Sequence, residues 1–326
     1  MDKLKILFLI KPFDTMYAKH KQKFESIREI EKFATVRYWY EDGNILEILK
    51  KLNFQPDCIV HYDIAWGYAF APRITGLDQV DIPKGCFVLD KHYSKETRIE
   101  YIESNKIDII FSRSKQRFIE VFPQYSNKLR WLPFSINPEI MKDWKLKKDI
   151  TYLLMGQVFH KSRELNKSKT REGRYPFRES VLKKMQNVKG FVFRPHPGHR
   201  VAFNKDLYVD IKYAKELNRS KMFFTCGSEF KIPVLKFFEA LACNTLLLAE
   251  ANQDIYELGF KDGVHFVACN KSNFLEKAMY YKENRDERRR ISKKGYKFVQ
   301  KYHTNNVRAK QFVQYIKDFI KENKKN

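Results

Sequence analysis

Short apolar segments that alternate with amphipathic segments are the feature that most limits how this chain can fold. In the first half, segments with strand composition occupy residues 5–10, 35–40, 57–61, 85–89, 108–112 and 128–132. Between them lie segments with helical periodicity, including residues 17–33 and 45–52. Strands that alternate with helices predict a parallel, right-handed, doubly wound α/β sheet.

The second half repeats the pattern, and the chain of 326 residues is long enough for two domains. Its predicted strands are residues 149–155, 190–193, 222–226 and 245–249. The last of these runs apolar without alternation, as a strand covered on both faces does. Pro133 and Pro138 predict a stiff connector between the halves. We therefore expect a first domain at residues 1–142 and a second at 143–303, followed by a terminal helix at 304–326.

The composition excludes some classes of protein. No apolar run reaches the about 18 residues that span a bilayer. The five cysteines are scattered without a C-x-x-C pair, which indicates buried thiols in a reducing compartment and predicts a cytoplasmic protein. The net charge of +24 would attract polyanions such as nucleic acid or anionic lipid. A lysine-rich composition can equally reflect an AT-rich genome, so both readings stay open.

The most informative segment is residues 222–250, which reads as strand, loop, helix and strand. Gly227 and Ser228 break the first strand, Pro233 suits the first turn of a helix, and apolar residues recur at helical spacing from Val234. Lys236 and Glu239 are three residues apart and share one side of this helix. Near a helix N-terminus they could hold a phosphate and a ribose. A surface ion pair is the alternative.

Ligands of doubly wound sheets bind beyond the carboxyl ends of the strands. Arg194-Pro-His196-Pro-Gly follows one predicted strand as a rigid cationic hook suited to phosphate, or as a structural turn. Asp90 and His92 follow the predicted strand at residues 85–89, and either side chain could deprotonate a hydroxyl group. The alternative is that Asp90 caps the next helix. The basic loop at residues 157–177 is either a phosphate clamp or a solvated loop.

A family resemblance adds to these expectations. Lys236-Phe-Phe-Glu239-Ala-Leu-Ala-Cys-Asn244 resembles the R-x-F-E-A-L-A-C-G signature of CgeB-like glycosyltransferases, a group within the GT-B enzymes. The resemblance extends over about residues 190–320 and includes the helical stretch from Tyr280 to Tyr302. Two residues depart from the signature: a lysine replaces the arginine at position 236, and Asn244 replaces a glycine.

The resemblance implies a GT-B fold, with two Rossmann-like domains that face a cleft and a terminal helix that packs back on the first domain. It implies a hexosyltransferase whose second domain binds a nucleotide sugar, most commonly a UDP-sugar. The residues that we expect to bind this donor are Glu239, Lys236, Arg194, His196, Gly227, Ser228, Gly156 and Arg178. We expect replacement of Glu239 or Arg194 to abolish donor hydrolysis without lowering the melting temperature.

The same resemblance assigns the acceptor to the first domain, with Asp90 or His92 as the catalytic base. No cofactor and no catalytic metal is expected, because the sequence has no DxD motif or ligand cluster in a suitable context. The acceptor is unknown, and the positive charge suggests an anionic one. Two alternatives stay open: a glycosyltransferase that acts on nucleic acid, and a non-catalytic nucleic-acid-binding protein with a GT-B shell. The basic terminal helix also leaves peripheral membrane contact open.

Overall fold

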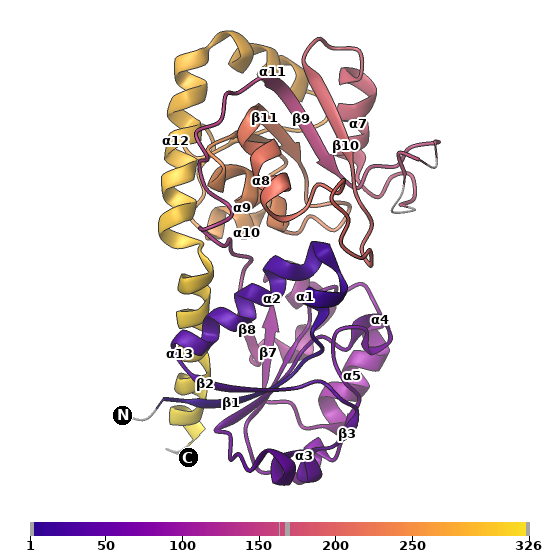
Figure 1. Cartoon of the computed structure of the whole chain (residues 1–326), viewed down its shortest axis with the longest axis vertical. Coiled ribbons are helices and arrows are strands. Elements are labelled where there is room, and N and C mark those ends of the chain that lie inside the picture. The colour runs from indigo at the N-terminus through magenta and orange to yellow at the C-terminus, as the bar shows by residue number, and fades with distance from the viewer. Residues whose placement is uncertain (1–2, 163, 167–169, 324–326) are drawn as a thin grey trace. The chain divides into compact units, whose positions relative to one another are not determined.

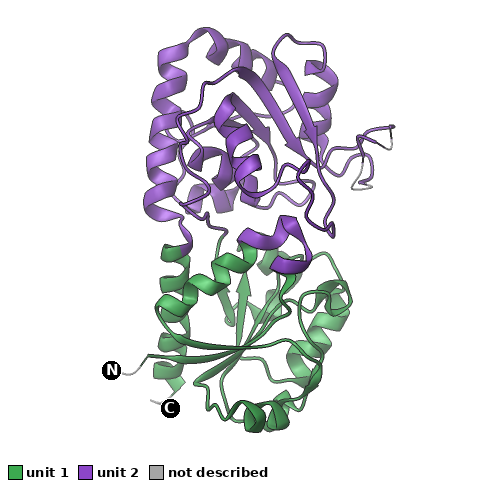
Figure 2. Ribbon diagram, viewed as in Figure 1, with its two compact units in different colours: residues 1–13, 23–133, 306–326 green, residues 14–22, 134–305 purple. Residues whose placement is uncertain are grey.

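The computed structural model describes residues 3–162, 164–166 and 170–323, and the chain divides into two compact units (Figures 1 and 2). Unit 1 comprises residues 1–13, 23–133 and 306–326, and unit 2 comprises residues 14–22 and 134–305. The chain passes from unit 1 to unit 2 after Pro133, within the connector that the two prolines predict.

Unit 1 contains a parallel six-stranded sheet in the order β2-β1-β4-β6-β7-β8. The strands are β1 (Lys5–Leu9), β2 (Thr35–Trp39), β4 (Cys58–His61), β6 (Lys84–Phe87), β7 (Ile109–Ser112) and β8 (Leu129–Trp131). A separate two-stranded pair joins β3 (Gly43–Asn44) to β5 (Ile74–Thr75). Each predicted strand of the first half is present, so the doubly wound parallel sheet is confirmed.

Between these strands lie the helices α1 (Phe13–Met16), α2 (Lys21–Arg28), α3 (Ile45–Leu52), α4 (Ala65–Tyr68), α5 (Lys95–Ser104) and α6 (Gln116–Val121), with short 3-10 turns at Ala18–His20, Glu29–Lys32, Leu77–Gln79 and Pro123–Tyr125. The last helix of the chain, α13 (Asn305–Asn323), also belongs to unit 1 from residue 306 onward. Phe312 of α13 packs on Phe8, Phe87 and Phe111, with ring centroids 5.8, 6.2 and 4.6 Å apart. The terminal helix therefore covers the aromatic face of the first sheet.

The helix predicted over residues 17–33 is present as an unbroken run of helical turns over residues 18–32. Only Lys21–Arg28 of this run is α-helical, because 3-10 turns at Ala18–His20 and Glu29–Lys32 flank α2. Tyr17 has an extended backbone, with φ −134° and ψ 106°, and precedes the first turn. Ile27 and Ile30 are buried. The apolar periodicity therefore identified the helical segment but not its 3-10 ends.

Unit 2 contains a parallel five-stranded sheet in the order β10-β9-β11-β12-β13. The strands are β9 (Ile150–Gly156), β10 (Phe191–Pro195), β11 (Ser220–Thr225), β12 (Leu246–Ala249) and β13 (Val267–Ala268). Because β9 lies between β10 and β11, the strand order reverses at β9. Ligands of such sheets bind where the order reverses, beyond the carboxyl ends of the strands.

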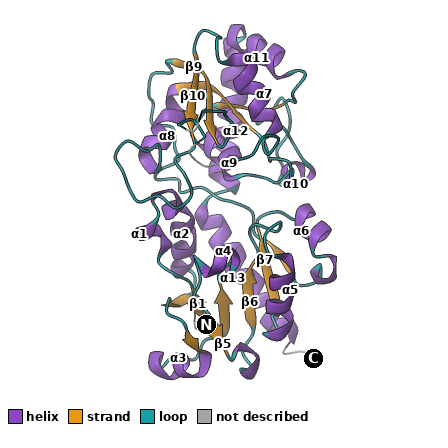
Figure 3. Ribbon diagram, turned by 90° about the vertical axis from the view of Figure 1, so that its right-hand side faces the viewer, coloured by secondary structure: helices purple, strands orange, loops and turns teal. Residues whose placement is uncertain are grey.

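Both faces of this second sheet are covered by helices, as Figure 3 shows. The helices are α7 (Pro176–Met185), α8 (Asp210–Arg219), α9 (Leu235–Ala242), α10 (Gln253–Glu257), α11 (Phe274–Glu283) and α12 (Arg285–Tyr302). Successive residues of one strand enter different cores: Leu153 packs with α8, α9 and α12, whereas Leu154 packs with α7 and α11. This double burial explains why the strands read as continuous apolar runs.

Two expectations about helix ends need correction. Helix α9 begins at Leu235 with Val234 as its N-cap, so Pro233 precedes the helix rather than lying in its first turn. The helical stretch from Tyr280 to Tyr302 is not continuous, because Asn284 leaves the helical conformation, with ψ 71°, between α11 and α12.

Asn244, which stands where the family signature has glycine, has φ 52°. Asparagine tolerates this left-handed conformation better than most residues, so the replacement preserves the turn after α9.

Two further features concern the whole described chain. All five cysteines are free and buried. Among the residues that the structure describes, no helix is long and apolar enough to cross a membrane.

Gly295 allows α12 to approach its neighbours closely, and this contact generates a test. A Cβ atom at this position would lie 2.3 Å from the carbonyl oxygen of His265 and 2.9 Å from Leu241 Cδ2. We predict that Gly295→Ala lowers the free energy of unfolding by about 1–3 kcal/mol, because the helix must shift to relieve the overlap. Lys294→Ala, at an exposed position on the same helix, should change it by less than about 0.5 kcal/mol in the same urea titration. Equal stability of the two variants would contradict this account.

His61 makes the stability of the protein depend on pH. Its Nδ1 accepts a hydrogen bond from the Tyr101 hydroxyl at 2.6 Å, and its Nε2 donates to the Pro72 carbonyl at 2.9 Å. Burial lowers the pKa of His61 from 6.5 to about 4. The unfolded chain therefore binds more protons than the native protein between these values, and stability is lost as the pH falls through that window.

We predict that His61 alone removes about 2 kcal/mol of stability between pH 7 and pH 5. His61→Gln retains a donor and an acceptor but does not titrate in this range, so its unfolding free energy should fall less steeply over the same interval. Urea unfolding of both proteins at the two pH values measures the difference. An identical pH slope would show that His61 is not responsible.

Candidate functional site

Two cationic side chains meet at Gly156, where β9 ends and the strand order reverses. A Cβ atom at Gly156 would lie 3.1 Å from Cε of Lys236 and 3.3 Å from Nη1 of Arg178. Arg178 is the third residue of α7, which begins with Pro176, and Lys236 is the second residue of α9. Only a residue without a side chain leaves this space open, and the space lies between two cations.

The guanidinium of Arg178 is held in place by neutral oxygen atoms. Its Nη2 donates to Thr225 Oγ1 at 3.0 Å and to the Cys226 carbonyl at 2.9 Å, and its Nη1 donates to the Gln157 carbonyl at 3.3 Å. The residue is only 3% exposed, and among the described residues its Nε has no acceptor and no carboxylate forms an ion pair with it. A buried charge without a counter-ion is costly, so this position favours an anionic ligand.

Lys236 and Glu239 are joined through Tyr213 of α8. The Tyr213 hydroxyl donates to Glu239 Oε2 at 2.9 Å, and Lys236 Nζ lies 3.4 Å from the same hydroxyl and 4.7 Å from the ring centroid. Burial, and then the charge of Glu239, raise the pKa of Tyr213, so its hydroxyl remains a donor. Glu239 is 6% exposed, which rules out the solvated surface ion pair that the sequence left open.

Arg194 is part of a structural ion pair. Its Nε donates to Glu216 Oε1 at 2.9 Å, and the second oxygen of this buried carboxylate accepts from Arg219 at 3.1 Å. Glu216 follows Tyr213 by three residues on α8, so Arg194 and Glu239 both contact the same part of this helix. Removal of Arg194 would leave Glu216 buried with only one partner. This geometry speaks against the expectation that Arg194 can be replaced without loss of stability.

His196 differs from the cation that its motif suggests. It is buried, and its Nδ1 accepts from the Gly198 amide at 3.0 Å, while Nε2 contacts Lys19. Burial, followed by the charge of Lys19, lowers the pKa of His196 far below its usual range, and Lys236 acts in the same direction. The imidazole is therefore neutral at pH 7, and of the two residues in the hook only Arg194 is charged.

Gly227 and Ser228 form a tight loop between β11 and α9. A Cβ atom at Gly227 would lie 2.4 Å from the Ile232 carbonyl oxygen, so no larger residue fits. The loop is closed by a hydrogen bond of 3.2 Å from the Ile232 amide to the Gly227 carbonyl, and Ser228 has φ 63°. The backbone geometry therefore requires glycine at position 227. That the nucleobase of the donor approaches this loop stays a prediction.

Asp90 and His92 lie in unit 1, in the turn after β6. Asp90 is half-buried, and its carbonyl accepts from the Tyr93 amide at 3.0 Å, while His92 is exposed. The N-cap of α5 is Ser94, so Asp90 does not have the helix-capping role that was its alternative. A catalytic role for either residue stays a prediction.

The basic loop is partly described. Its residues Arg163, Lys167 and Lys169 lie outside the described residues. Arg171 and Arg174 both form ion pairs with Glu229, which follows Ser228 in the loop after β11. This part of the basic loop is therefore attached to the loop that precedes α9.

Sequence reasoning did not identify Tyr213, Glu216 or Thr225, although each contacts a predicted site residue. Tyr213 and Glu216 lie on α8 and Thr225 on β11, and no sequence motif connects them to the site residues that they contact. The structure contains no cluster of three or more His, Cys, Asp or Glu residues that could hold a metal ion among the residues it describes.

Comparisons with known proteins agree with this architecture. Residues 171–314 match the model of the family described as glycosyl transferase-like. No curated protein matches the chain significantly. HepE from Anabaena, solved in complex with UDP and glucose, superposes with a TM-score of 0.59 at 10% identity, over 97% of this chain and 100% of HepE.

Two further solved structures share the fold. A glycosyltransferase from Rickettsia africae has a TM-score of 0.59 at 12% identity, over 98% of this chain and 100% of its own. Sucrose-phosphate synthase from Thermosynechococcus elongatus has a TM-score of 0.60 at 12% identity, with the same coverage of 98% and 100%. These similarities show the GT-B fold, whereas the CgeB-like subfamily stays a prediction. The family match and the fold together support a glycosyltransferase with two α/β units of the GT-B type and a glycosyl transferase-like domain at residues 171–314.

Proposed function

We propose that the protein transfers a sugar from a UDP-sugar, which unit 2 binds at the carboxyl end of β9. The observation that carries this proposal is the buried guanidinium of Arg178, which has no carboxylate partner among the described residues and lies with Lys236 beside Gly156. The choice of UDP rests on HepE, which is similar in fold and was solved with UDP and glucose and with UDP-glucose.

In this proposal, Arg178 and Lys236 bind the diphosphate of the donor. Gly156 allows the phosphate oxygens to approach the backbone, and the N-terminus of α9 adds a favourable dipole. The Glu239 carboxylate accepts hydrogen bonds from the ribose hydroxyls, with one oxygen already oriented by Tyr213. Arg194, held by Glu216, and His196 border the same region, and Gly227 and Ser228 provide the loop for the base.

The chemistry follows from this arrangement. When the bond between the anomeric carbon and the phosphate oxygen breaks, the electron pair stays on the diphosphate. The fixed cations stabilise that charge without reorganisation, which supports a reaction that needs no catalytic metal. The acceptor hydroxyl attacks the anomeric carbon and loses its proton to Asp90 or His92 of unit 1. The acceptor is a hydroxyl compound, and we propose that it is anionic. The comparisons give no support to the alternatives that involve nucleic acid.

The first test concerns the diphosphate. We predict that Lys236→Met weakens UDP binding at least about tenfold, because a charge-assisted contact is lost, and reduces UDP-sugar hydrolysis in EDTA. The melting temperature should change by less than about 2 °C. Calorimetric titration with UDP and thermal unfolding measure these effects. Lys183→Met, at an exposed position on α7, is the matched control and should bind UDP like the wild type. Unchanged UDP affinity in the Lys236 variant would remove the diphosphate assignment.

The second test concerns the ribose. We predict that Glu239→Gln weakens UDP binding about tenfold, because the carboxylate that accepts from the hydroxyls is lost. The glutamine keeps an acceptor for the Tyr213 hydroxyl, so the fold should survive. A UDP analogue without the 2′ and 3′ hydroxyls should bind the variant and the wild type with similar affinity. If the variant loses the same factor for both ligands, Glu239 does not act through the ribose.

A further inference from the structure

A second cationic pocket lies at the opposite edge of the sheet in unit 2. Its lining includes Lys147 and Lys148, which precede β9, Lys221 at the start of β11, and Asn244, which precedes β12. The end of α11 and the first turns of α12 complete it, and its volume is about 940 Å³. Because the strands are parallel, their amino ends lie at the edge opposite to Gly156. The pocket is therefore separate from the proposed UDP site.

The charges in this pocket are strongly unbalanced. Nine lysine and arginine side chains line it, but only two carboxylates do. Both carboxylates are already paired with lysines of the pocket, Asp143 with Lys145 at 2.9 Å and Glu283 with Lys282 at 3.0 Å. The other seven cations form no ion pair with a carboxylate of the described residues: Lys147, Lys148, Lys221, Arg285, Arg288, Arg289 and Lys293.

Arg288 adds a buried cation to this group. The residue is 8% exposed, and its Nη1 donates to the carbonyls of Tyr281 and Lys282. Its Nε and Nη2 have no protein acceptor in the described part of the chain. Burial, and then the charges of Arg289 and Arg285, lower the pKa of Arg288. An anion in the pocket would relieve this repulsion and supply the missing acceptors.

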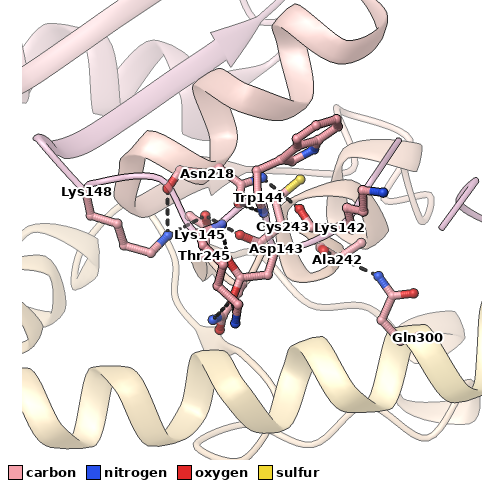
Figure 4. Close-up of polar contacts among 11 residues, drawn as sticks. Lys142, Asp143, Trp144, Lys145, Lys148, Asn218, Ala242, Cys243, Thr245 and Gln300 are labelled. Carbon is pink, nitrogen blue, oxygen red and sulfur yellow. Dashed lines mark hydrogen bonds and ion pairs between the residues drawn. The ribbon is translucent and has the colours of Figure 1, made fainter. Parts of the chain in front are cut away.

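One wall of the pocket is held in a fixed position (Figure 4). The Trp144 amide donates to Asn218 Oδ1 at 2.7 Å, and Asn218 Nδ2 donates to the Lys142 carbonyl at 2.8 Å. Lys148 Nζ donates to the carbonyls of Asn218 and Ser220, both at 2.9 Å. These bonds fix the backbone of the segment that carries Lys145 and Lys147, so only the lysine side chains have to be ordered when a ligand binds.

We propose that this pocket binds a compact anion with two or more linked phosphate groups, independently of the UDP site. The volume lies within the roughly 300–1,000 Å³ range of small-molecule pockets. An array of unpaired cations from three segments of the chain suits several phosphate groups held at once. A soluble polyphosphate and the headgroup of a phosphate-rich lipid share this chemistry.

The test uses tripolyphosphate as the probe and a reversal of charge in the pocket. Arg285→Glu combined with Arg289→Glu changes two exposed residues, so the fold should be retained. In calorimetric titrations, the wild type should bind tripolyphosphate, and the double variant should lose at least about tenfold in affinity. The variant should bind UDP like the wild type, because the UDP site lies at the other edge of the sheet.

The control is Lys183→Glu combined with Lys189→Glu, which makes the same change in net charge at exposed positions outside the pocket. It should bind tripolyphosphate like the wild type. An equal loss of affinity in both double variants, or no binding by the wild type, would overturn the proposal. Sedimentation with vesicles that contain a diphosphate lipid identifies the source. Sedimentation that only the pocket variant loses assigns a lipid headgroup, and tripolyphosphate binding without sedimentation assigns a soluble anion.

Discussion

The parallel direction of the strands in unit 2 is the constraint on which both proposed sites depend. Strands buried on both faces require helices on both sides, and each helical crossover returns the chain in the same direction. All carboxyl ends consequently lie at one edge of the sheet and all amino ends at the other. The first edge carries Gly156 with Arg178 and Lys236, and the second carries the pocket formed with α12.

Each edge contains a buried guanidinium that neutral oxygen atoms hold. Arg178 donates to Thr225 and to two carbonyls, and Arg288 donates to the carbonyls of Tyr281 and Lys282. Such bonds fix the position of a cation but do not neutralise it, and burial without a counter-charge opposes folding. The contrast with Arg194, which pairs with Glu216, is informative. An arginine that is paired with a carboxylate stabilises the fold, whereas an arginine that has only neutral acceptors is suited to bind an anionic ligand.

The sequence predicted most of the secondary structure because its signals are local. The strands were found from their apolar runs, and α3 was found from residue 45 to residue 52. The 3-10 turns that flank α2 were missed because residues three apart share a face in both kinds of helix, so the apolar spacing is similar. The neutral state of His196 was also missed, because it depends on burial and on Lys19, which is distant in the sequence. The role of Tyr213 was missed for the same reason, because its hydrogen bond to Glu239 joins two helices that no sequence motif relates.

The sequence by itself determined the two α/β halves, the GT-B resemblance and the residue types at the strand ends, because periodicity and short motifs are properties of neighbouring residues. Only the tertiary structure decided which cations are balanced. It paired Arg194 with Glu216, placed Arg178 beside Gly156 without a carboxylate partner among the described residues, and gathered cations from three segments at the opposite edge. The physical reason is that electrostatic balance depends on distance and burial, and these are set by how segments far apart in the chain pack together.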